Sequence, residues 1–533
     1  MAPVPAPWWK TGVVYEVYPR SFQDTTGDGI GDLKGIARRL DHFVDLGVDA
    51  VWIAPFYPSP MADYGYDVAD YCGVDPMFGT MADFDGLLAA AHTKGLKLIV
   101  DLVPNHTSIA HPWFQASRSS KADPKRDWYI WRDPAPGGGP PNNWLSIFGG
   151  PAWEYDPSTE QYYLHSFLVG QPDLNWRNPE IERVMFDAMR FWLDKGVDGF
   201  RIDVLWMLIK DGQFRDNPPD PDWKDGVDIP YLRFKPVYSS DRPELMDLMI
   251  RMRALADSYA GDRVLIGETY LPVKRLAAYY GPHGEGVHLP FNFKLIQTPW
   301  DAAEVDTIVR RYDAALPAFA WPNWVIGNHD QPRAASRLGG REEARAAAVL
   351  LLTLRGTPTL YYGEELGLQD VDIPAGQTHD PRAITEPGYG RDPERTPMPW
   401  TGETRGGFTE GTPWLPLGPE HLPLNVQAQG ADPDSTLNLY RRLLALRRAE
   451  PALHSGAFEP LGVQGAVMGY LREDGAGAGF LVLVNFAAAA GVFQSAEALS
   501  GRIVLATHRA REGDTAAGSI SLEPNEALVI RLD

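Results

Sequence analysis

Apolar and polar residues follow a repeated pattern along most of the chain. Amphipathic stretches with helical spacing end at or near a glycine, and a short, almost wholly apolar run follows each of them. The helices predicted in this way are Leu33 to Leu46, Met81 to Lys94, Pro179 to Lys195, Arg242 to Tyr259 and Arg341 to Arg355. The strands that follow them read AVWIAP, LKLIVDLV, GFRID, VLIGE and TPTLYYGEE. Apolar strands that alternate with helices predict an α/β fold with a parallel sheet covered on both faces, and this many short-linked units favours a (β/α)8 TIM barrel.

Two segments depart from this pattern. Residues 104–175 are rich in Pro, Gly, Trp and Asp and carry many aromatic residues, which predicts a small domain inserted after the third strand. Residues 451–533 contain the short runs VMGYLRE, GFLVLVNF, RIVLATH and ALVIRL between turn residues, which predicts a C-terminal antiparallel β-sandwich domain. The barrel then comprises residues 1–103 and 176–450.

Composition narrows the classes of partner. The 49 lysines and arginines face 70 aspartates and glutamates, and the net charge of −21 argues against nucleic acid or an anionic membrane as partner. The single cysteine, Cys72, excludes an internal disulfide. The N-terminus MAPVPAPWWK lacks the features of a signal peptide, and no apolar run reaches the ~20 residues of a membrane span. We therefore expect a cytoplasmic protein, either a monomer or a homodimer.

Three acidic residues stand where predicted strands end: Asp203 closes GFRID, Glu268 closes VLIGE and Asp330 closes WVIGNHD. The carboxyl ends of barrel strands are where such barrels carry out chemistry. Retaining glycoside hydrolysis needs a carboxylate nucleophile and a carboxylic acid about 5 to 5.5 Å from it. Arg201 lies two residues before Asp203 and so on the same face of the strand, where its charge is expected to keep the aspartate ionised.

Further polar residues accompany these acids. Asp330, with His329 before it, is placed to bind sugar hydroxyls and to stabilise the positive charge of an oxocarbenium-like transition state. The segment DLVPNH brings Asp101, Asn105 and His106 to another strand end. Any one of these acids could instead cap a helix or pair with an arginine, but four such segments in one barrel favour a catalytic site.

Together these residues resemble the α-amylase family of glycoside hydrolases, whose four short motifs look like DLVPNH, GFRID, GET and GNHD in this order. The resemblance covers nearly the whole chain, including the inserted and C-terminal domains. It implies that Asp203 is the nucleophile, Glu268 the general acid and base, and Asp330 the transition-state stabiliser. It also implies that three further residues shape the subsite of the reacting glucose: His106, Arg201 and His329.

Within the family the chain looks most like the α-glucosidase and oligo-1,6-glucosidase branch, because of the segments DYGYD, QPDLN and RTPMPW. That resemblance implies that Asp63 and Arg391 clamp the outer hydroxyls of a terminal glucose, with Arg395 as the alternative arginine. A clamp of this kind would block further sugar units and enforce attack from the chain end. The resemblance also implies that Tyr66 and two aromatic residues of the insertion line the glucose pocket: Phe148 and Phe167.

Val204, next to the predicted nucleophile, would crowd the leaving-group side of the site. In this branch, resemblance associates valine there with cleavage of α-1,6 links, and alanine or threonine with α-1,4 links. Valine is also a common strand residue, so a packing role is an equal alternative.

The segment DTTGDGIGD, residues 24–32, has oxygen ligands at alternate positions, like the first half of a calcium loop. It resembles the metal loop of the oligo-1,6-glucosidase branch, which implies a structural Ca²⁺ or Mg²⁺ held by Asp24, Thr26, Asp28, the Ile30 carbonyl and Asp32. An Asp-rich turn without metal is the alternative. Such an ion would brace a loop and take no part in the reaction.

Three functions remain open at this point. The first is a retaining, exo-acting α-glucosidase that releases glucose from small α-linked sugars of the maltose, isomaltose, sucrose or trehalose type. The second is a glucosyl-transferring or isomerising enzyme of the same fold, such as a sucrose or trehalose isomerase. The third is a non-catalytic carbohydrate-binding or transporter accessory protein, which we expect to lack the acids or to carry a membrane helix; this sequence does neither.

Overall fold

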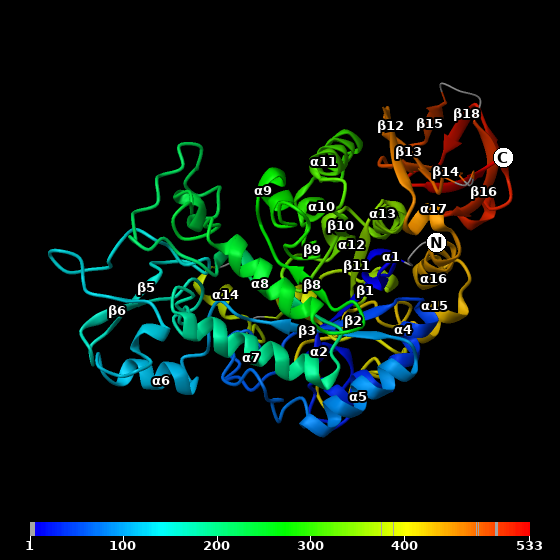
Figure 1. Cartoon of the computed structure of the whole chain (residues 1–533). Helices are drawn as coiled ribbons and strands as arrows, with labels where there is room; N and C mark the ends of the chain where they lie inside the picture. Colours follow the sequence, from blue (N-terminus) through cyan, green and yellow to red (C-terminus); the bar gives the residue numbers. More distant parts are fainter. Residues whose placement is uncertain (1–5, 375, 387, 476, 478, 496–498) are drawn as a thin grey trace.

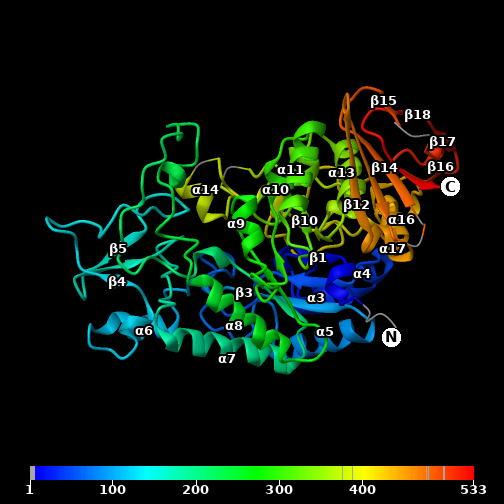
Figure 2. The ribbon, with the colours of Figure 1, turned by 45° about the horizontal axis from the view of Figure 1, so that its top comes forward.

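The structure is a computed structural model that describes residues 6–374, 376–386, 388–475, 477, 479–495 and 499–533. The first five residues of the N-terminal segment lie outside this description. A barrel occupies the middle of the molecule, the inserted segment extends from one end, and the C-terminal β domain covers the other end (Figures 1 and 2).

The barrel is an eight-stranded sheet in the order β10-β11-β1-β2-β3-β7-β8-β9, and every pairing within it is parallel. Its strands are β1 (Val14–Val17), β2 (Ala50–Ile53), β3 (Lys97–Leu102), β7 (Gly199–Ile202), β8 (Val264–Gly267), β9 (Leu289–Pro290), β10 (Asn323–Val325) and β11 (Thr357–Tyr361). Between β9 and β10 the Asn323 side chain accepts from Asn292 N at 2.8 Å and donates to Pro290 O. These side-chain hydrogen bonds help to close the barrel between β9 and β10. The prediction of a TIM barrel is confirmed.

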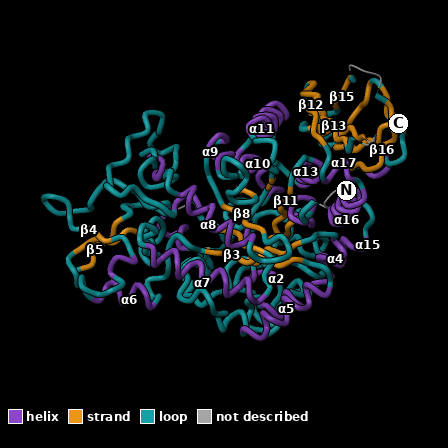
Figure 3. Tube along the Cα trace, viewed as in Figure 1, coloured by secondary structure: helices purple, strands orange, loops and turns teal. Residues whose placement is uncertain are grey.

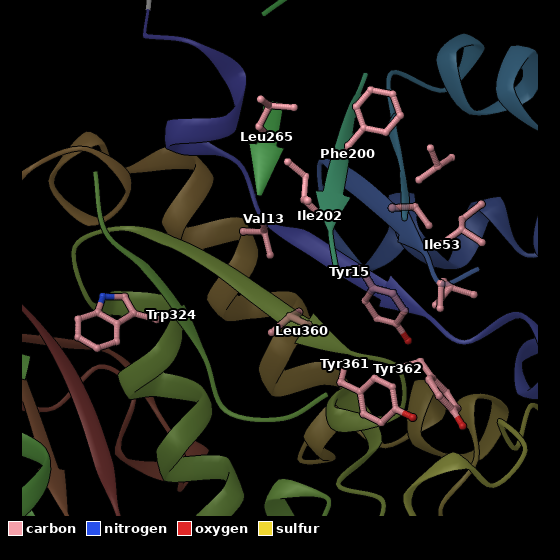
Figure 4. Close-up of a cluster of buried hydrophobic side chains, with 14 of the residues drawn as sticks. Val13, Tyr15, Ile53, Phe200, Ile202, Leu265, Trp324, Leu360, Tyr361 and Tyr362 are labelled. Carbon is pink, nitrogen blue, oxygen red and sulfur yellow. The ribbon is translucent and has the colours of Figure 1, made fainter. Parts of the chain in front are cut away.

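Alternate residues of the barrel strands enter two different apolar cores, as the period of two of a β-strand requires. Val14, Trp52, Ile99 and Ile266 belong to one cluster, which fills the barrel. Their neighbours belong to a second cluster, which packs against the helices: Tyr15, Ile53, Phe200, Ile202, Leu265, Trp324 and Leu360 (Figure 4). The same alternation places Glu16, Asp101 and Arg201 inside the barrel near the carboxyl ends of its strands.

The predicted helices match the structure closely in four places: α5 (Met81–Thr93), α7 (Pro179–Lys195), α8 (Leu245–Asp257) and α13 (Arg341–Thr353). Asn178 caps α7 by accepting from Glu180 N, and Gly196 ends that helix in the left-handed conformation that glycine favours. The single helix expected over Leu33 to Leu46 was wrong. Arg39, with ψ of 10°, separates α3 (Leu33–Arg38) from α4 (Leu40–Leu46).

The other helices are shorter or lie towards the C-terminal domain. They are α1 (Trp8–Thr11), α2 (Pro19–Phe22), α6 (Pro112–Ser119), α9 (Val273–Ala278), α10 (Lys294–Gln297), α11 (Ala302–Ala315), α12 (Ala334–Arg337), α14 (Pro381–Thr385), α15 (Val426–Ala431), α16 (Thr436–Ala449) and α17 (Pro451–His454). The 3-10 helices are η1 (Arg126–Trp128), η2 (Leu205–Met207), η3 (Pro230–Arg233), η4 (Glu364–Leu366), η5 (Pro393–Arg395) and η6 (Arg509–Arg511). Among helices of the described residues, we find none with the length and apolar character of a membrane span.

The inserted segment after β3 is mostly loop around a small antiparallel sheet, ordered β4-β6-β5 (Figure 3). Its strands are β4 (Trp131–Arg132), β5 (Trp153–Asp156) and β6 (Gln161–Leu164). The loop that follows β7 packs on it, because Trp144 Nε1 donates to Arg215 O at 2.9 Å and Phe214 contacts the same apolar cluster. This second segment was not predicted from the sequence.

The C-terminal domain contains a six-stranded sheet, β12-β13-β14-β19-β16-β17, and a two-stranded sheet, β15-β18. Its strands are β12 (Ala457–Gln464), β13 (Val467–Glu473), β14 (Gly479–Asn485), β15 (Gly491–Gln494), β16 (Ser500–Ala506), β17 (Thr515–Ala517), β18 (Ser519–Leu522) and β19 (Ala527–Leu532). Pairings in both sheets are antiparallel, which confirms the predicted antiparallel β domain.

Candidate active site

Arg201 holds two of the predicted acids together. Asp203 directly follows β7 and Glu268 directly follows the neighbouring strand β8. Arg201 Nη1 lies 2.7 Å from Asp203 Oδ1, and Arg201 Nη2 lies 2.7 Å from Glu268 Oε2. All three side chains are buried. Because both carboxylates bond to one planar guanidinium, they lie side by side, as in a retaining glycosidase.

The turn after Asp203 aims a backbone donor at Glu268. Val204 has φ of 39°, a left-handed conformation that is rare for a β-branched residue. In this conformation its N–H donates to Glu268 Oε2 at 2.9 Å. Strain of this kind persists only where the surroundings impose it, and it is common at functional sites.

The charge of Asp203 depends on opposing influences. Burial raises the pKa of its carboxyl well above the ordinary value, Arg201 lowers this pKa, and the neighbouring Glu268 raises it again. We expected Arg201 to keep Asp203 ionised, but burial outweighs that charge. Because the two carboxylates share one guanidinium, a proton bound here belongs to the pair.

Asp330 lies in a loop, and not at a strand end as expected, because β10 already ends at Val325. Its Oδ1 accepts from Arg391 Nη1 at 3.2 Å and from Arg395 Nη2 at 2.9 Å. Burial raises the pKa of Asp330, but His329, Arg391 and Arg395 together lower it below its ordinary range. Asp330 therefore stays ionised at neutral pH, as charge stabilisation requires.

Arg391 connects Asp330 to the segment DYGYD. Its Nη2 lies 2.7 Å from Asp63 Oδ1, and its Nε and Nη2 lie 2.9 and 2.8 Å from the two carboxylate oxygens of Asp380. Arg395 donates instead from Nε to the backbone carbonyl of His329 at 2.7 Å. Of the two arginines weighed for the clamp, Arg391 is therefore the one that pairs with Asp63.

The other predicted pocket residues lie around this clamp. Gln171 Nε2 donates to Asp63 Oδ2 at 3.0 Å, and His106 Nε2 donates to Tyr66 O at 2.9 Å. The Phe167 ring lies 5.2 Å from that of His106 and 5.4 Å from that of Phe148. The Arg391 guanidinium lies over the Phe148 ring. These contacts bring the predicted substrate-binding residues together on one side of the site, with three exceptions: Arg201, Val204 and His329.

His329 joins this side of the site to the acids. Its ring stacks on Tyr66, and its Nε2 lies 2.7 Å from Tyr66 Oη and 3.2 Å from Asp330 Oδ2. Burial lowers the pKa of His329 to about 3, so the ring is neutral at pH 7. Tyr66 Oη in turn donates to Asp101 Oδ2 at 3.1 Å, and burial raises the pKa of Asp101 to about 7.

Sequence comparison settles the family. The family model of the α-amylase catalytic domain matches residues 16–456. This chain belongs to the α-amylase family. It is 44% identical over 486 residues to a probable alpha-glucosidase of Rhizobium meliloti, covering 88% of this chain and 87% of that protein. It is 40% identical over 490 residues to an oligo-1,6-glucosidase of Parageobacillus thermoglucosidasius, with 85% of each chain covered.

One solved structure is similar to this chain over nearly its whole length. The α-glucosyl transfer enzyme XgtA matches with a TM-score of 0.94 and 42% identity, covering 99% of this chain and 100% of that one. The relatives confirm the predicted glucosidase branch of the α-amylase family, which is a family of glycoside hydrolases.

Some residues of this α-amylase family site were missed or only partly recognised in the sequence. Asp380, whose two carboxylate oxygens accept from Arg391, is the N-cap of α14, and its sequence pattern signals a helix start and no site residue. Lys210 is buried, and its Nζ lies 2.6 Å from Asp173 Oδ2 and 2.6 Å from Asn105 Oδ1. This ammonium group ties the inserted segment to the barrel. Its only signal was its place among apolar residues shortly after the GFRID motif.

The predicted metal loop has the oxygen donors that a hard cation prefers, but the structure gives several of them other partners. Asp24 accepts from the backbone N–H groups of Thr26, Gly27 and Gly29, while Asp28 accepts from Ile30 N. Asp32 caps α3 and accepts from Thr25. Across the described residues, His, Cys, Asp and Glu side chains nowhere gather in threes as a metal site would need. A structural Ca²⁺ or Mg²⁺ in this loop stays a prediction.

Proposed function

We propose that this protein is a retaining, exo-acting α-glucosidase that hydrolyses terminal α-linked glucose from disaccharides and short oligosaccharides. The observation that carries the proposal is the arrangement of Asp203 and Glu268 on one guanidinium, with Arg201 Nη1 and Nη2 each 2.7 Å from one carboxylate. Adjacent carboxylates leave no room for a water molecule between nucleophile and sugar, which inversion would need.

The first half of the reaction breaks the glycosidic bond. The Asp203 carboxylate attacks the anomeric carbon, and Glu268 gives its proton to the leaving oxygen, so that a covalent glucosyl-enzyme forms and the aglycone leaves. The reactive state of the pair is the one in which Glu268 holds the shared proton. The ionised Asp330 stabilises the positive charge that develops on the glucose ring.

The second half releases glucose. Glu268, now a carboxylate, takes a proton from water, and the resulting oxygen attacks the anomeric carbon and frees Asp203. Two inversions retain the configuration, so glucose leaves as the α-anomer. The Asp63–Arg391–Asp380 cluster supports exo action, because its buried charges would bind the outer hydroxyls of the last glucose and end the pocket there.

Glucosyl transfer is the second candidate, and its support is the match to an α-glucosyl transfer enzyme at 42% identity over nearly the whole chain. In transfer or isomerisation the same glucosyl-enzyme forms, but a sugar hydroxyl replaces water as the acceptor. The residues around the acceptor would then determine whether hydrolysis or transfer occurs, because both reactions use the same catalytic acids.

Product analysis over time with separate samples of maltose, isomaltose, sucrose and trehalose tests the proposal. We expect early release of α-glucose, and the relative rates would rank the linkages. Isomerised or longer sugars with little free glucose would make transfer the main function. No change in any sample would contradict both and favour a sugar-binding role. A cytoplasmic location and a monomeric or homodimeric state are further predictions, the second of which light scattering would test.

A further inference from the structure

Glu16 is a buried acid directly behind the site. It lies on β1, has no exposed surface, and faces the barrel interior, where the charges of Arg201, Asp330 and Asp101 act on it. One of its oxygens, Oε1, is hydrogen-bonded to Nδ1 of His329. The other, Oε2, has no hydrogen-bond partner within the described part of the chain. A buried carboxylate with one oxygen unpaired costs more free energy than a buried protonated carboxyl with the same oxygen unpaired.

The contacts on the far side of the imidazole decide which nitrogen of His329 carries the proton. Nε2 lies 3.2 Å from Asp330 Oδ2, which can only accept because that carboxylate is ionised. Nε2 also lies 2.7 Å from Tyr66 Oη, whose single proton is directed to Asp101 Oδ2 at 3.1 Å. Both neighbours of Nε2 therefore need a donor, and Nε2 must carry the hydrogen.

A neutral imidazole has one N–H, so with Nε2 protonated Nδ1 is an acceptor. The hydrogen of the bond between Glu16 and His329 must then come from Glu16. The assignment agrees with the direction of the pKa values, because burial raises the pKa of Glu16 well above its ordinary value and lowers that of His329 to about 3.

We propose that Glu16 is a positioning residue that stays protonated and donates to Nδ1 of His329, which holds the Nε2–H of that histidine towards Asp330 and the bound glucose. This inference rests on the proposed function, because it concerns the group that would contact the sugar. It assigns no contact with substrate to Glu16 itself. In other proteins too, the hydrogen-bond partner behind a functional histidine determines its tautomer and the orientation of its ring.

The charges around Glu16 oppose one another. Arg201 favours its ionised form, while three carboxylates disfavour it: Asp101, Asp330 and Glu364. His329 faces it directly, and the Tyr361 hydroxyl on β11 lies close enough to interact with it. When Glu16 finally ionises at alkaline pH, its carboxylate needs a donor from Nδ1, so Nε2 loses its hydrogen and the contact to Asp330 becomes repulsive.

The test compares the wild type with Glu16→Gln and Glu16→Leu on the best of the four disaccharides between pH 5 and pH 9. Glutamine donates to Nδ1 and does not ionise, so we expect kcat near that of the wild type at pH 6 and a weaker decline at alkaline pH. Leucine cannot donate, and we expect kcat to fall about 10- to 100-fold with a smaller change in KM. Asp187→Asn, which removes an exposed carboxyl on α7, is the control and should leave the alkaline decline unchanged.

A second readout does not need turnover. A raised pKa in the folded state means that the stabilising contribution of protonated Glu16 is lost as pH rises above the unfolded value. The Tm of Glu16→Gln minus the Tm of the wild type should therefore increase from pH 5 to pH 8. An unchanged alkaline decline in Glu16→Gln, or a Tm difference that does not grow with pH, would overturn the inference. Absence of turnover by the wild type would contradict the proposed function, while the Tm comparison would still test Glu16.

Discussion

Arg391 Nη2 lies 2.7 Å from Asp63 Oδ1, although the two residues are 328 positions apart in the chain. Both side chains are buried, and the same guanidinium also binds Asp380 and Asp330. Three loops that follow different strands therefore meet at one positive charge. In the proposed function, that meeting point closes the glucose pocket on the side away from the scissile bond.

Arg391→Lys should lower kcat/KM on maltose by about 10²-fold, because a lysine cannot replace the forked contacts to Asp63 and Asp380. The loss should be smaller on maltohexaose, since the pocket is no longer closed. Initial rates on both sugars measure this ratio. Arg183→Lys, on the exposed face of α7, is the control. An equal loss on both sugars would show that Arg391 does not limit substrate length.

Asp203→Asn should lower kcat by about 10⁴-fold or more, because the amide cannot form the glucosyl-enzyme. The Tm should change little, since Asn keeps the shape of the side chain. Single-turnover assays and a thermal melt measure the two effects, with the exposed Asp187→Asn as control. Activity close to that of the wild type would contradict the assignment of Asp203 as the nucleophile.

Val204→Ala should raise activity on maltose relative to isomaltose by roughly tenfold, because it removes two methyl groups beside the predicted nucleophile. The measurement is the ratio of kcat/KM on the two sugars. Ile202→Val, which removes one carbon from a buried residue of β7 that packs in the outer core, should leave this ratio unchanged. If Val204→Ala also leaves the ratio unchanged, Val204 has a packing role and does not determine linkage specificity.

Calcium should raise the Tm by a few degrees and excess chelator should lower it, if the loop of residues 24–32 binds the ion as predicted. Differential scanning fluorimetry in CaCl2, MgCl2 and EDTA measures this. Asp28→Asn should abolish the response, because Asp28 is the most exposed of the predicted carboxylate ligands. A Tm that is the same in all three solutions would show that the N–H donors of the loop suffice to hold it.

Glu364→Gln should stabilise the protein at pH 8 by roughly 1–3 kcal/mol and have little effect at pH 5. Burial raises the pKa of Glu364 to about 8, so the folded state keeps a proton that the unfolded chain releases above its ordinary pKa. Folding is therefore penalised increasingly as pH rises from about 5 to 8.

Urea unfolding at the two pH values measures the difference. Glu365→Gln is the matched control. Glu365 accepts hydrogen bonds from Tyr15 Oη, His42 Nε2 and Gly363 N, so its substitution should destabilise the protein at both pH values. Equal effects of Glu364→Gln at pH 5 and pH 8 would contradict a raised pKa.

Periodicity was sufficient to predict the barrel, since helix stops such as Gly196 and apolar strands such as GFRID are local signals. It failed where tertiary contacts override local preference. The break at Arg39 coincides with two long-range contacts, one from its Nε to Gln23 and one from its guanidinium to the Trp400 ring. Asp330 was placed at a strand end because WVIG looks like a strand, whereas β10 covers only three residues.

The sequence by itself determined which residue types stand at the strand ends, because the alternation of side chains along a strand puts Arg201 and Asp203 on one face wherever the strand lies. Only the tertiary structure decided which distant groups meet them. It paired Arg391, and not Arg395, with Asp63, added Asp380 to the clamp, and placed Glu16 behind His329. The first and last of these contacts join residues 328 and 313 positions apart, and closure of the barrel sets their distances, which no local pattern records.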